Sequence, residues 1–407
     1  MSLKILFLSS DLYPPHRVDV KVLFGRELIS RGHRIDWILQ SEMPGDAERE
    51  EETSEGKVWV GARPIGQSLI ASFKKHILGL KNDLRIIGLM KSHVYDLVIV
   101  KDKFLIGAIT AVAARLFKQP IAFWLSWPFP EEYLEKAANA SFPRFALYWL
   151  RGTIFKILLY KIIIPRADKV FVQSEQMKID VIKKGAEAGK VRPVLMGIEH
   201  AEIASFSDHP ERKLIPPAVP CFLYLGIISR VRELDILVRV LALVKKQVPD
   251  AKLYMVGGGE SLEDEDFIMR EVGRLNLEEA IVMTGQQPRS IALQYAKEAN
   301  VCVSPFAPNP ILQSTSPTKL VEYLAIGQPV VANDHPEQRQ VIKESGAGLC
   351  VGWNEEEFAN AIVLLLRDKV LRAEMGQKGP EYVRRNRTYT AIADLVETEL
   401  LDLVKAS

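Results

Sequence analysis

Short apolar segments alternate with helical patterns along this chain, and that alternation limits the folds it can adopt. Residues 4–10 predict a strand, residues 19–31 show helical apolar spacing, and residues 34–39 predict the next strand. The pattern then continues with strands expected at 96–100, 120–125 and 169–173 and helices expected at 107–117 and 175–184. Strands joined by helices pair in parallel, so we expect an α/β fold with a parallel sheet.

The alternation breaks once and then starts again. Residues 196–220 contain four prolines among Gly, His, Ser and Asp, which is typical of a linker. After this break, strands are expected at 221–225, 251–256, 280–284, 301–305 and 329–332, and a helix at 234–247. The sequence therefore predicts two doubly wound, Rossmann-like domains that face each other across a cleft, with a boundary near residue 200. An amphipathic helix at about 389–404 could pack on either domain.

Charge and composition indicate where such a protein works. The 407 residues carry a net charge of +2, but residues 1–200 hold 30 Lys and Arg against 22 Asp and Glu, and the remainder holds 23 against 29. The first half is therefore the one attracted to anionic surfaces, and no nucleic-acid partner is expected. Three widely spaced cysteines predict no disulfide framework, and no segment has the pattern of a signal peptide or membrane span. We expect a cytoplasmic protein, soluble or peripheral on the inner face of the cell membrane.

A short helix with both ends marked is expected in the last third of the chain, and its start suits an anion. Ser316 is a good N-cap, Pro317 fits the first helical position, and Gly327 closes the helix. The free amides of the first turn favour a phosphate, and Lys319 adds a full positive charge. Glu322 lies on the same face, where a carboxylate could accept hydrogen bonds from a ribose. These features indicate a nucleotide, although a capped helix with a lysine and a glutamate is also a common structural element.

Two further loops lie at the expected carboxyl ends of strands. The loop after Gly226 holds Arg230 and Arg232, which either neutralise a diphosphate or form a solvated surface. The turn Gly257-Gly258-Gly259 lacks the third glycine of a dinucleotide fingerprint, so it indicates either a tight bend or the close approach of a ligand.

Two acidic runs carry less information. Residues 48–55 are expected to form a solvated loop. Asp264-Glu265-Asp266 is similar to an Asp-x-Asp metal motif, but it lies outside any expected strand end. We therefore expect no metal site.

Together these features resemble a retaining glycosyltransferase of family 4 with the GT-B fold. The likeness covers nearly the whole chain and rests on Tyr13-Pro14-Pro15 through Arg31-Gly32-His33, Ala167-Asp168-Lys169 to Ser174-Glu175, Tyr224-Leu225-Gly226, Val256 to Gly259, and Ser316-Pro317-Thr318-Lys319 to Pro329-Val330-Val331. The resemblance implies that residues 201–385 bind a nucleotide-sugar donor and residues 1–200 bind the acceptor. It also implies that the last helix, at about 386–407, joins the first domain.

The resemblance assigns roles to single residues. Glu322 matches the family's ribose-binding glutamate, Arg232 stands where the family has a phosphate-binding lysine, and Gln286-Gln287 matches the base-binding loop. The catalytic residues expected on this basis are Arg232, Lys319 and Glu322. The donor site as a whole is expected to consist of Gly226, Arg230, Arg232, Gly257, Gly258, Gln286, Gln287, Ser314, Ser316, Thr318, Lys319, Leu320 and Glu322.

Several positions depart from the family pattern, and we interpret them as divergence in substrate. Ser314 replaces an earlier glutamate, and Ile227 replaces an arginine for which Arg230 is the possible substitute. On the acceptor side, residues 16–19 replace a glycine pair, and Ser126 stands where many members have a histidine. The acceptor-side residues expected are His16, Arg17, Ser126 and Trp127.

Two segments of the basic half indicate contact with an anionic membrane. Residues 142–166 interleave apolar and aromatic residues with Arg144, Arg151, Lys156, Lys161 and Arg166, and residues 72–91 do so with Lys74, Lys75, Lys81, Arg85 and Lys91. Such basic amphipathic helices are typical of a membrane interface. The alternative is a helix packed on its own domain with snorkelling lysines.

We therefore expect a peripheral glycosyltransferase that moves a sugar from a nucleoside diphosphate to a lipid-linked or glycan acceptor in surface polysaccharide synthesis. UDP is the expected nucleotide, and no cofactor is expected besides this donor. Two alternatives remain. An epimerase or hydrolase of the same fold would convert the donor without an acceptor, and a non-catalytic protein, favoured by Ser314 and Ser126, would bind a nucleotide sugar or lipid without turnover.

Overall fold

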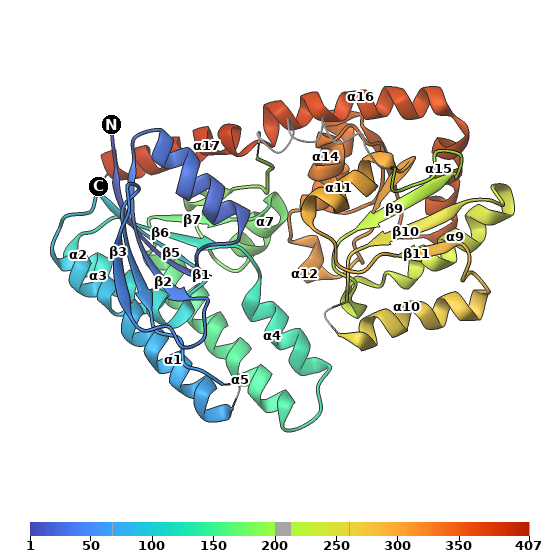
Figure 1. Cartoon of the computed structure of the whole chain (residues 1–407). Coiled ribbons are helices and arrows are strands. Elements are labelled where there is room, and N and C mark those ends of the chain that lie inside the picture. Colours follow the sequence, from blue (N-terminus) through green and yellow to red (C-terminus); the bar gives the residue numbers. More distant parts are fainter. Residues whose placement is uncertain (67, 200–212, 260, 407) are drawn as a thin grey trace. The chain divides into compact units, whose positions relative to one another are not determined.

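The chain folds into two compact units, each built around one open sheet (Figure 1). The computed structural model describes residues 1–66, 68–199, 213–259 and 261–406. Met1–Leu195 and Ile392–Ser407 form the first unit, and Met196–Ala391 form the second unit. Most of the predicted linker, residues 200–212, lies outside the described residues.

The first unit contains an eight-stranded sheet in the order β3-β4-β2-β1-β5-β6-β7-β8. The strands are β1 (Lys4–Tyr13), β2 (Arg34–Ser41), β3 (Arg49–Glu52), β4 (Lys57–Gly61), β5 (Leu97–Lys101), β6 (Ile121–Leu125), β7 (Lys169–Val172) and β8 (Val191–Pro193). Only β3 with β4 is antiparallel among these neighbouring pairs. Because β2 and β5 flank β1, the strand order reverses between β1 and β5.

The prediction of a solvated loop at 48–55 is wrong. Residues Arg49–Glu52 form β3, which pairs with β4 at the edge of the sheet. The main chain pairs with β4 while the charged side chains stay largely in water, and charged residues are a common protection for an exposed edge.

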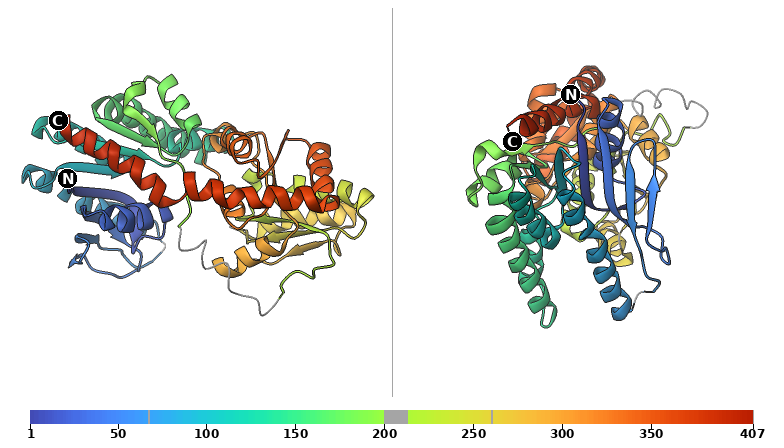
Figure 2. Two further views of the ribbon diagram at one scale, coloured as in Figure 1. Left: turned by 90° about the horizontal axis from the view of Figure 1, so that it is seen from above. Right: turned by 90° about the vertical axis from the view of Figure 1, so that its left-hand side faces the viewer.

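Helices connect the strands of the first unit and lie on both faces of its sheet (Figure 2). They are α1 (Leu69–Asp83), α2 (Arg85–Lys91), α3 (Phe104–Phe117), α4 (Phe129–Ala138), α5 (Arg144–Ile157), α6 (Ile164–Arg166), α7 (Glu175–Lys183), the π-helices η1 (Asp19–Leu28) and η2 (Leu158–Ile163), the 3-10 turn η3 (Ala188–Lys190), and α17 (Tyr389–Lys405). None of the helices in the described ranges combines the length and apolarity needed to cross a bilayer.

The second unit contains a six-stranded, fully parallel sheet in the order β11-β10-β9-β12-β13-β14. The strands are β9 (Cys221–Leu225), β10 (Lys252–Val256), β11 (Ile281–Met283), β12 (Val301–Ser304), β13 (Val330–Asn333) and β14 (Gly348–Val351). The helices are η4 (Arg230–Arg232), α9 (Asp235–Gln247), α10 (Leu262–Leu275), α11 (Arg289–Glu298), α12 (Pro310–Gln313), α13 (Thr318–Ala325), α14 (Pro336–Ser345), α15 (Glu355–Arg367) and α16 (Lys369–Asn386). Both units have the predicted doubly wound α/β fold.

The apolar strands bury side chains on both faces of each sheet. In β9, Phe222 and Tyr224 belong to one core cluster, whereas Cys221 and Leu223 belong to the other. This alternation follows from the two-residue period of a strand. Continuous apolar runs, rather than alternating ones, are what a parallel sheet covered on both faces requires.

The last helix, α17, is held in the first unit by ion pairs. Glu399 is 8% exposed and lies 2.6 Å from Lys169 Nζ, and it also contacts Arg192. Glu397 pairs with Arg31 at 2.7 Å and with His33 at 3.0 Å. Burial alone would raise the pKa of Glu399, but Lys169 and Arg192 hold that pKa below its usual range.

We predict that Glu399→Ala lowers the free energy of unfolding of the first unit by about 3 kcal/mol, because two cations lose a largely buried carboxylate. The stabilising contribution of Glu399 should be fully present at pH values above the ordinary glutamate pKa of about 4.3. It should vanish as the pH falls through the lower pKa that Glu399 has in the folded protein. Urea unfolding followed by tryptophan fluorescence measures it. The control is Asp402→Ala, whose 68%-exposed side chain should contribute less than about 0.5 kcal/mol. Equal losses in both variants would contradict the prediction.

Candidate functional site

The strand order of the second unit reverses between β9 and β12, because β10 and β12 flank β9. Open α/β sheets bind ligands at such a reversal, beyond the carboxyl ends of the strands. Gly226 follows β9, Gly257 follows β10, and Phe306 lies just after β12. This edge of the sheet, with helix α13 beside it, is the candidate site.

Lys319 lies in the first turn of α13, and its ammonium group is enclosed by aromatic side chains. Its Nζ donates a hydrogen bond to the Tyr224 hydroxyl at 3.0 Å and lies 4.2 Å from the centre of the Tyr224 ring and 5.2 Å from that of Phe306. Burial and the charge of Arg232 lower the pKa of Lys319 well below its usual value, and Glu322 opposes this shift. An anion bound beside Lys319 would favour its charged form.

Tyr224 links this lysine to Arg232. The tyrosine is fully buried, and its hydroxyl donates to the Ile227 carbonyl at 2.9 Å. Burial raises the pKa of Tyr224 to about 12, although the charge and hydrogen bonding of the half-buried Arg232 oppose that shift. The structure therefore brings Lys319 and Arg232, the two expected phosphate-binding cations, to the same hydroxyl group.

Two glycines allow the backbone to close in beside Lys319. Gly226 has a φ of +141° and Gly257 a φ of +140°, a region that side chains rarely adopt. A Cβ at Gly257 would lie 2.1 Å from the Gly226 carbonyl oxygen, and a Cβ at Gly226 would lie 3.5 Å from Lys319 Nζ. The glycine turn is thus a close approach of two backbone segments, and a side chain at Gly226 would contact the Lys319 ammonium group.

A pocket of about 390 Å³ opens beside these turns. Its lining includes the backbone of the turns after β9 and β10, with Gly258, and the side chains of Gln286 and Gln287. Gln287 Nε2 donates to the Thr284 carbonyl at 2.8 Å, which orients its amide group, whereas Gln286 is exposed. The lining also includes the apolar residues Leu225, Ile227, Val256 and Ala292. Apolar walls with a few backbone and amide groups around a space of this size are typical of a small-ligand site.

Ser316 does not cap α13, so this part of the prediction is wrong. The helix begins at Thr318, Pro317 occupies the N-cap position instead of the first helical position, and no side chain caps the first turn. The Ser316 hydroxyl instead donates to Glu337 Oε1 at 2.7 Å and accepts the Met196 N–H at 3.0 Å. Because residues distant in sequence bind the Ser316 hydroxyl, this group does not cap the helix. The amides of the first turn still have no acceptor within the helix.

The remaining residues of α13 contribute in different ways. Thr318 is half-buried, whereas the Leu320 side chain lies in the apolar core, so only the Leu320 backbone can face a ligand. Gly327 follows the helix with a φ of +77°, which confirms the predicted helix end.

Glu322 is buried and forms an ion pair with Arg289, with 2.7 Å between Nη1 and Oε1. Arg289 is the first residue of α11 and had not been predicted as a site residue. The available signal was its position directly after the expected base-binding loop, Gln286-Gln287. The expected ribose-binding carboxylate therefore has a cationic partner in addition to the nearby Lys319.

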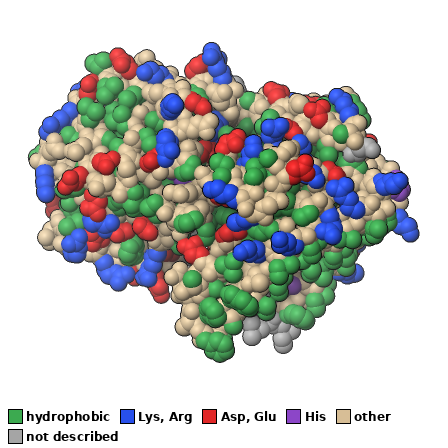
Figure 3. Space-filling model, turned by 180° about the vertical axis from the view of Figure 1, so that it is seen from behind, with side chains coloured by type: hydrophobic (Ala, Val, Ile, Leu, Met, Phe, Trp, Pro, Cys, Tyr) green, Lys and Arg blue, Asp and Glu red, His purple; other side chains and the backbone are tan. Residues whose placement is uncertain are grey.

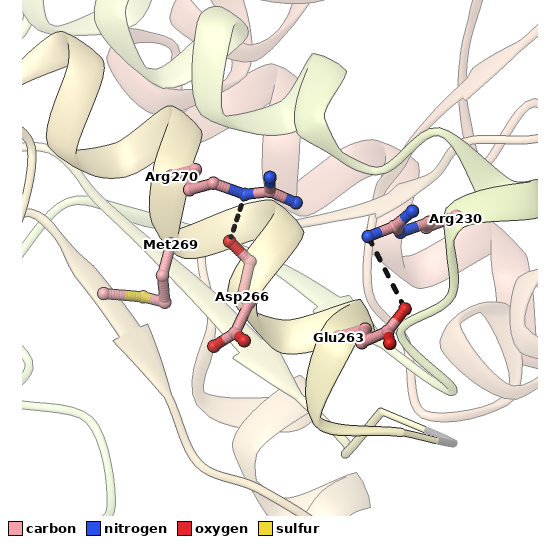
Figure 4. Close-up of a pocket in the computed structure, with 5 residues that line it drawn as sticks. All are labelled: Arg230, Glu263, Asp266, Met269 and Arg270. Carbon is pink, nitrogen blue, oxygen red and sulfur yellow. Dashed lines mark hydrogen bonds and ion pairs between the residues drawn. The ribbon is translucent and has the colours of Figure 1, made fainter.

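Two residues expected in the donor site, Ser314 and Arg230, contribute less to the candidate site than predicted. Ser314 follows α12 and is buried, and its amide donates to the Ile311 carbonyl at 3.2 Å. Arg230 lies at a second pocket, of about 580 Å³, beside Glu263, Asp266, Met269 and Arg270 (Figure 4). There its guanidinium lies 3.9 Å from Glu263. The lining of the pocket beside the glycine turns contains none of the charged residues expected in the donor site, which are Arg230, Arg232, Lys319 and Glu322.

The acidic run after the glycine turn has structural partners. Asp264 accepts the Ser261 and Arg230 amides, each at 3.1 Å, and Glu265 accepts the Gly259 amide at 2.9 Å. Asp264 thereby completes a capping box at the start of α10. Across the part of the chain that the structure describes, no three His, Cys, Asp or Glu residues gather as a metal site would require.

On the acceptor side, a buried charge cluster joins two of the expected residues. Ser126 donates its amide to Asp102 at 2.8 Å, and its hydroxyl donates to the same carboxylate. Lys101 Nζ lies 3.6 Å from Asp102 and 2.9 Å from Asp11, and Arg17 Nε lies 3.7 Å from Asp11. The cluster sits where the strand order of the first sheet reverses, between β1 and β5.

Sequence reasoning missed Asp11, Asp19, Lys101 and Asp102. Burial raises the pKa of Asp102. Burial alone would also raise the pKa of Asp11, but the charge of Lys101 holds that pKa below its usual value. Asp11, Lys101 and Asp102 lie just beyond the ends of expected buried strands, which was the available signal. Asp19, 3.5 Å from Lys101 Nζ, is the first residue of η1 and has no such signal.

The other two acceptor-side residues lie outside this cluster. His16 pairs with Glu42 at 2.6 Å and is largely exposed. Trp127 donates its indole N–H to Glu132 at 2.9 Å. The contacts of His16 and Trp127 are therefore with carboxylates nearer the surface.

Comparison with protein families covers almost the whole chain. Residues 22–202 match the family described as Glycosyltransferase Family 4, and residues 205–382 match the family described as Glycosyl transferases group 1. Among curated relatives, a Bacillus subtilis protein provisionally named teichuronic acid biosynthesis glycosyltransferase TuaH is 28% identical over 55% of this chain and 53% of its own. The Mycobacterium leprae phosphatidyl-myo-inositol mannosyltransferase is 31% identical over 45% of this chain and 47% of its own. The matches span about half the length of these relatives.

Solved structures share the fold over the full length. Sucrose-phosphate synthase from Thermosynechococcus elongatus has a TM-score of 0.71 at 20% identity and covers 100% of both chains. The Anabaena protein HepE, crystallised with UDP, has a TM-score of 0.69 at 16% identity and covers 98% of this chain and 100% of its own. At these identities the likeness establishes the fold, which is GT-B.

We predict that Gly257→Ala disrupts the candidate site, because its Cβ would meet the Gly226 carbonyl. Strain at a left-handed position costs about 1–3 kcal/mol, and the displaced turn should also weaken nucleotide binding. Thermal unfolding and calorimetry with UDP measure the two effects. Gly273→Ala, inside α10 with no neighbouring atom nearer than 3.7 Å, is the control and should be neutral or stabilising. The prediction fails if the two variants unfold at the same temperature.

Proposed function

Since this chain belongs to the family 4 glycosyltransferases of GT-B type, we propose that it transfers a sugar from a UDP-sugar to a lipid-linked or glycan acceptor with retention of configuration. One observation carries this proposal: Lys319 and Arg232 converge on the Tyr224 hydroxyl beside the uncapped N-terminus of α13. UDP as the nucleotide is supported by the fold shared with HepE, whose crystal contains UDP.

In this proposal the nucleoside diphosphate is the leaving group. Breaking the glycosidic bond places negative charge on the departing phosphate, and the cations of Lys319 and Arg232 with the amides of α13 stabilise that charge. Because these groups are already positioned by buried contacts, little reorganisation is needed during the reaction. Two side-chain cations at the phosphate make a metal ion unnecessary in this scheme.

Glu322 recognises the ribose in this scheme. Its carboxylate can accept hydrogen bonds from two hydroxyl groups, and Arg289 holds it in place from the side of α11. The pocket beside Gln286 and Gln287 then receives the base. In this arrangement Glu322 contacts the ribose, while Lys319 and Arg232 bind the phosphates.

We assign the acceptor to the first unit, where the carboxylate of Asp102 and the hydroxyl of Ser126 lie at the end of the sheet. Such groups suit the hydroxyls of a sugar or polyol. The names of two relatives refer to teichuronic acid biosynthesis and to phosphatidyl-myo-inositol, which supports a glycan or a lipid-linked acceptor. We propose the cytoplasmic face of the cell membrane as the place of this reaction, and surface polysaccharide synthesis as its purpose.

The first test is transfer by Arg232→Ala and Lys319→Ala. A thermal-shift screen of nucleotide sugars identifies the donor, which should be a UDP-sugar. With this donor, each variant should lose about 2–4 kcal/mol of transition-state stabilisation, measured as kcat/KM. Arg270→Ala, at the separate pocket of Arg230, is the matched control and should keep its rate. Near-normal transfer by both site variants would refute the assignment, and a screen without any stabilising nucleotide sugar would refute the proposed function.

The second test is nucleotide binding by Glu322→Gln. This change keeps the shape of the side chain but weakens its acceptance of two hydroxyl protons, so UDP affinity should fall by about 1.5–3 kcal/mol. Calorimetry with UDP gives the value. Because Glu322 pairs with Arg289, Arg289→Ala is measured beside it to separate loss of the pair from loss of the ribose contact. If Glu322→Gln binds UDP as tightly as the wild type does, Glu322 has no role in ribose recognition.

A further inference from the structure

Helix α3 of the first unit exposes an apolar stripe. Leu105, Ile109, Val112 and Leu116 are 52%, 39%, 41% and 75% exposed, and they recur at a spacing of four, three and four residues. The opposite side of the helix is buried in the core of the unit. A helix that is apolar all round is normally covered on every side, and this stripe has no cover within its own unit.

Helix α5 extends this apolar surface. The ring of Phe155 on α5 stacks on that of Phe104 on α3, with 4.4 Å between their centres. The exposed apolar residues of α5 include Leu147, Leu150, Ile154 and Ile157, which are 43–64% exposed and recur at helical spacing. We call the exposed stripes of α3 and α5 together the α3–α5 face. Exposed apolar surface on neighbouring segments marks an interaction site.

Helices α3 and α5 carry basic residues and no Asp or Glu, whereas α4, which packs on α5, carries Glu131, Glu132 and Glu135. Residues 104–130 and 136–166 contain no Asp or Glu, while the second range alone contains six Lys and Arg. Lys118, Lys156 and Lys161 are exposed along these segments. Seen from behind, hydrophobic side chains gather over the helices of the first unit with basic side chains along their border (Figure 3). Anionic groups are therefore the complement of this face.

We propose that the α3–α5 face docks on an anionic lipid bilayer, with the stripes in the acyl boundary and the lysines at the headgroups. A second copy of this chain would bring like charges together on the same face, whereas anionic headgroups would neutralise them. The proposal deepens the proposed function and rests on its placement of the enzyme at a membrane. The proposal also adds α3 to the membrane-binding surface. This helix contains no acidic residue, and no role was predicted for its exposed apolar stripe.

The basic residues that were expected to contact the membrane differ in their contacts within the structure. Arg151 stacks on the ring of Tyr133 at 4.3 Å, within the pair formed by α4 and α5, and Arg166 donates to backbone carbonyls. These two arginines are engaged in their own unit. Lys156 and Lys161 are therefore the residues of choice for a charge-reversal test.

The test is sedimentation with vesicles of phosphatidylcholine containing about 30% phosphatidylglycerol, compared with phosphatidylcholine alone. Wild type should bind only the anionic vesicles, and less at high salt. Ile109→Glu/Leu116→Glu and, separately, Lys156→Glu/Lys161→Glu should each weaken binding by about tenfold or more. Matched controls on the second unit, with similar exposure, are Leu364→Glu/Val370→Glu and Lys246→Glu/Lys343→Glu, and both should bind like the wild type.

Thermal unfolding and UDP calorimetry on every variant show that the fold and the donor site are intact, so a failure of docking is distinguishable from a failure of the proposed function. Sedimentation equilibrium without lipid tests whether the α3–α5 face instead binds a second copy of this chain. Wild type that stays in the supernatant at low salt would overturn the proposal. So would equal loss of binding in the controls, or a lipid-independent dimer that the Ile109→Glu/Leu116→Glu variant dissociates.

Discussion

The ammonium group of Lys319 is the constraint around which the second unit is arranged. Removing a charge from water is costly unless partners replace the water. Here the Tyr224 hydroxyl and the rings of Tyr224 and Phe306 replace part of it, but the neighbouring Arg232 adds repulsion. A diphosphate would offset both the desolvation and the repulsion. The local electrostatics therefore favour an anion at this edge of the sheet, independently of any sequence motif.

The surrounding contacts keep this cation in place. Tyr323 on α13 accepts the Leu225 amide at 2.7 Å, which ties the helix to the end of β9. Arg387 binds Glu337 at 2.8 Å, and the same carboxylate accepts the Ser316 hydroxyl, so the loop before α13 is anchored to the end of α16. Buried, interconnected polar groups of this kind favour one geometry. The loss of Ser316 as a cap is thus balanced by a more rigid approach to the helix.

Local patterns in the sequence were enough to place most of the strands, but β3, β4, β8 and β14 were not predicted. The phosphate-binding role of Lys319 and Arg232 stays a prediction. Apolar runs bounded by glycine define β9 and β10, and Lys319 is placed by the helix that starts beside it. The partners of Ser316 and Glu322 could not be predicted, because Glu337 and Arg289 come from helices distant in sequence. The strand at Arg49–Glu52 was missed because an edge strand pairs through its backbone while its acidic side chains stay in water, which leaves no apolar alternation to detect.

The two halves of the chain use charge in different ways. Residues 1–200 carry an excess of eight basic residues, and the lysines of the α3–α5 face lie in water, where salt screens them over about 8–10 Å. The remainder carries an excess of six acidic residues, so its overall field does not attract a nucleotide. In the proposed function, donor binding must then come from short contacts with the partly buried Lys319 and Arg232, which salt screens less than exposed charges. The proposed membrane docking and donor binding should therefore respond differently to ionic strength, because one depends on exposed charge and the other on partly buried charge.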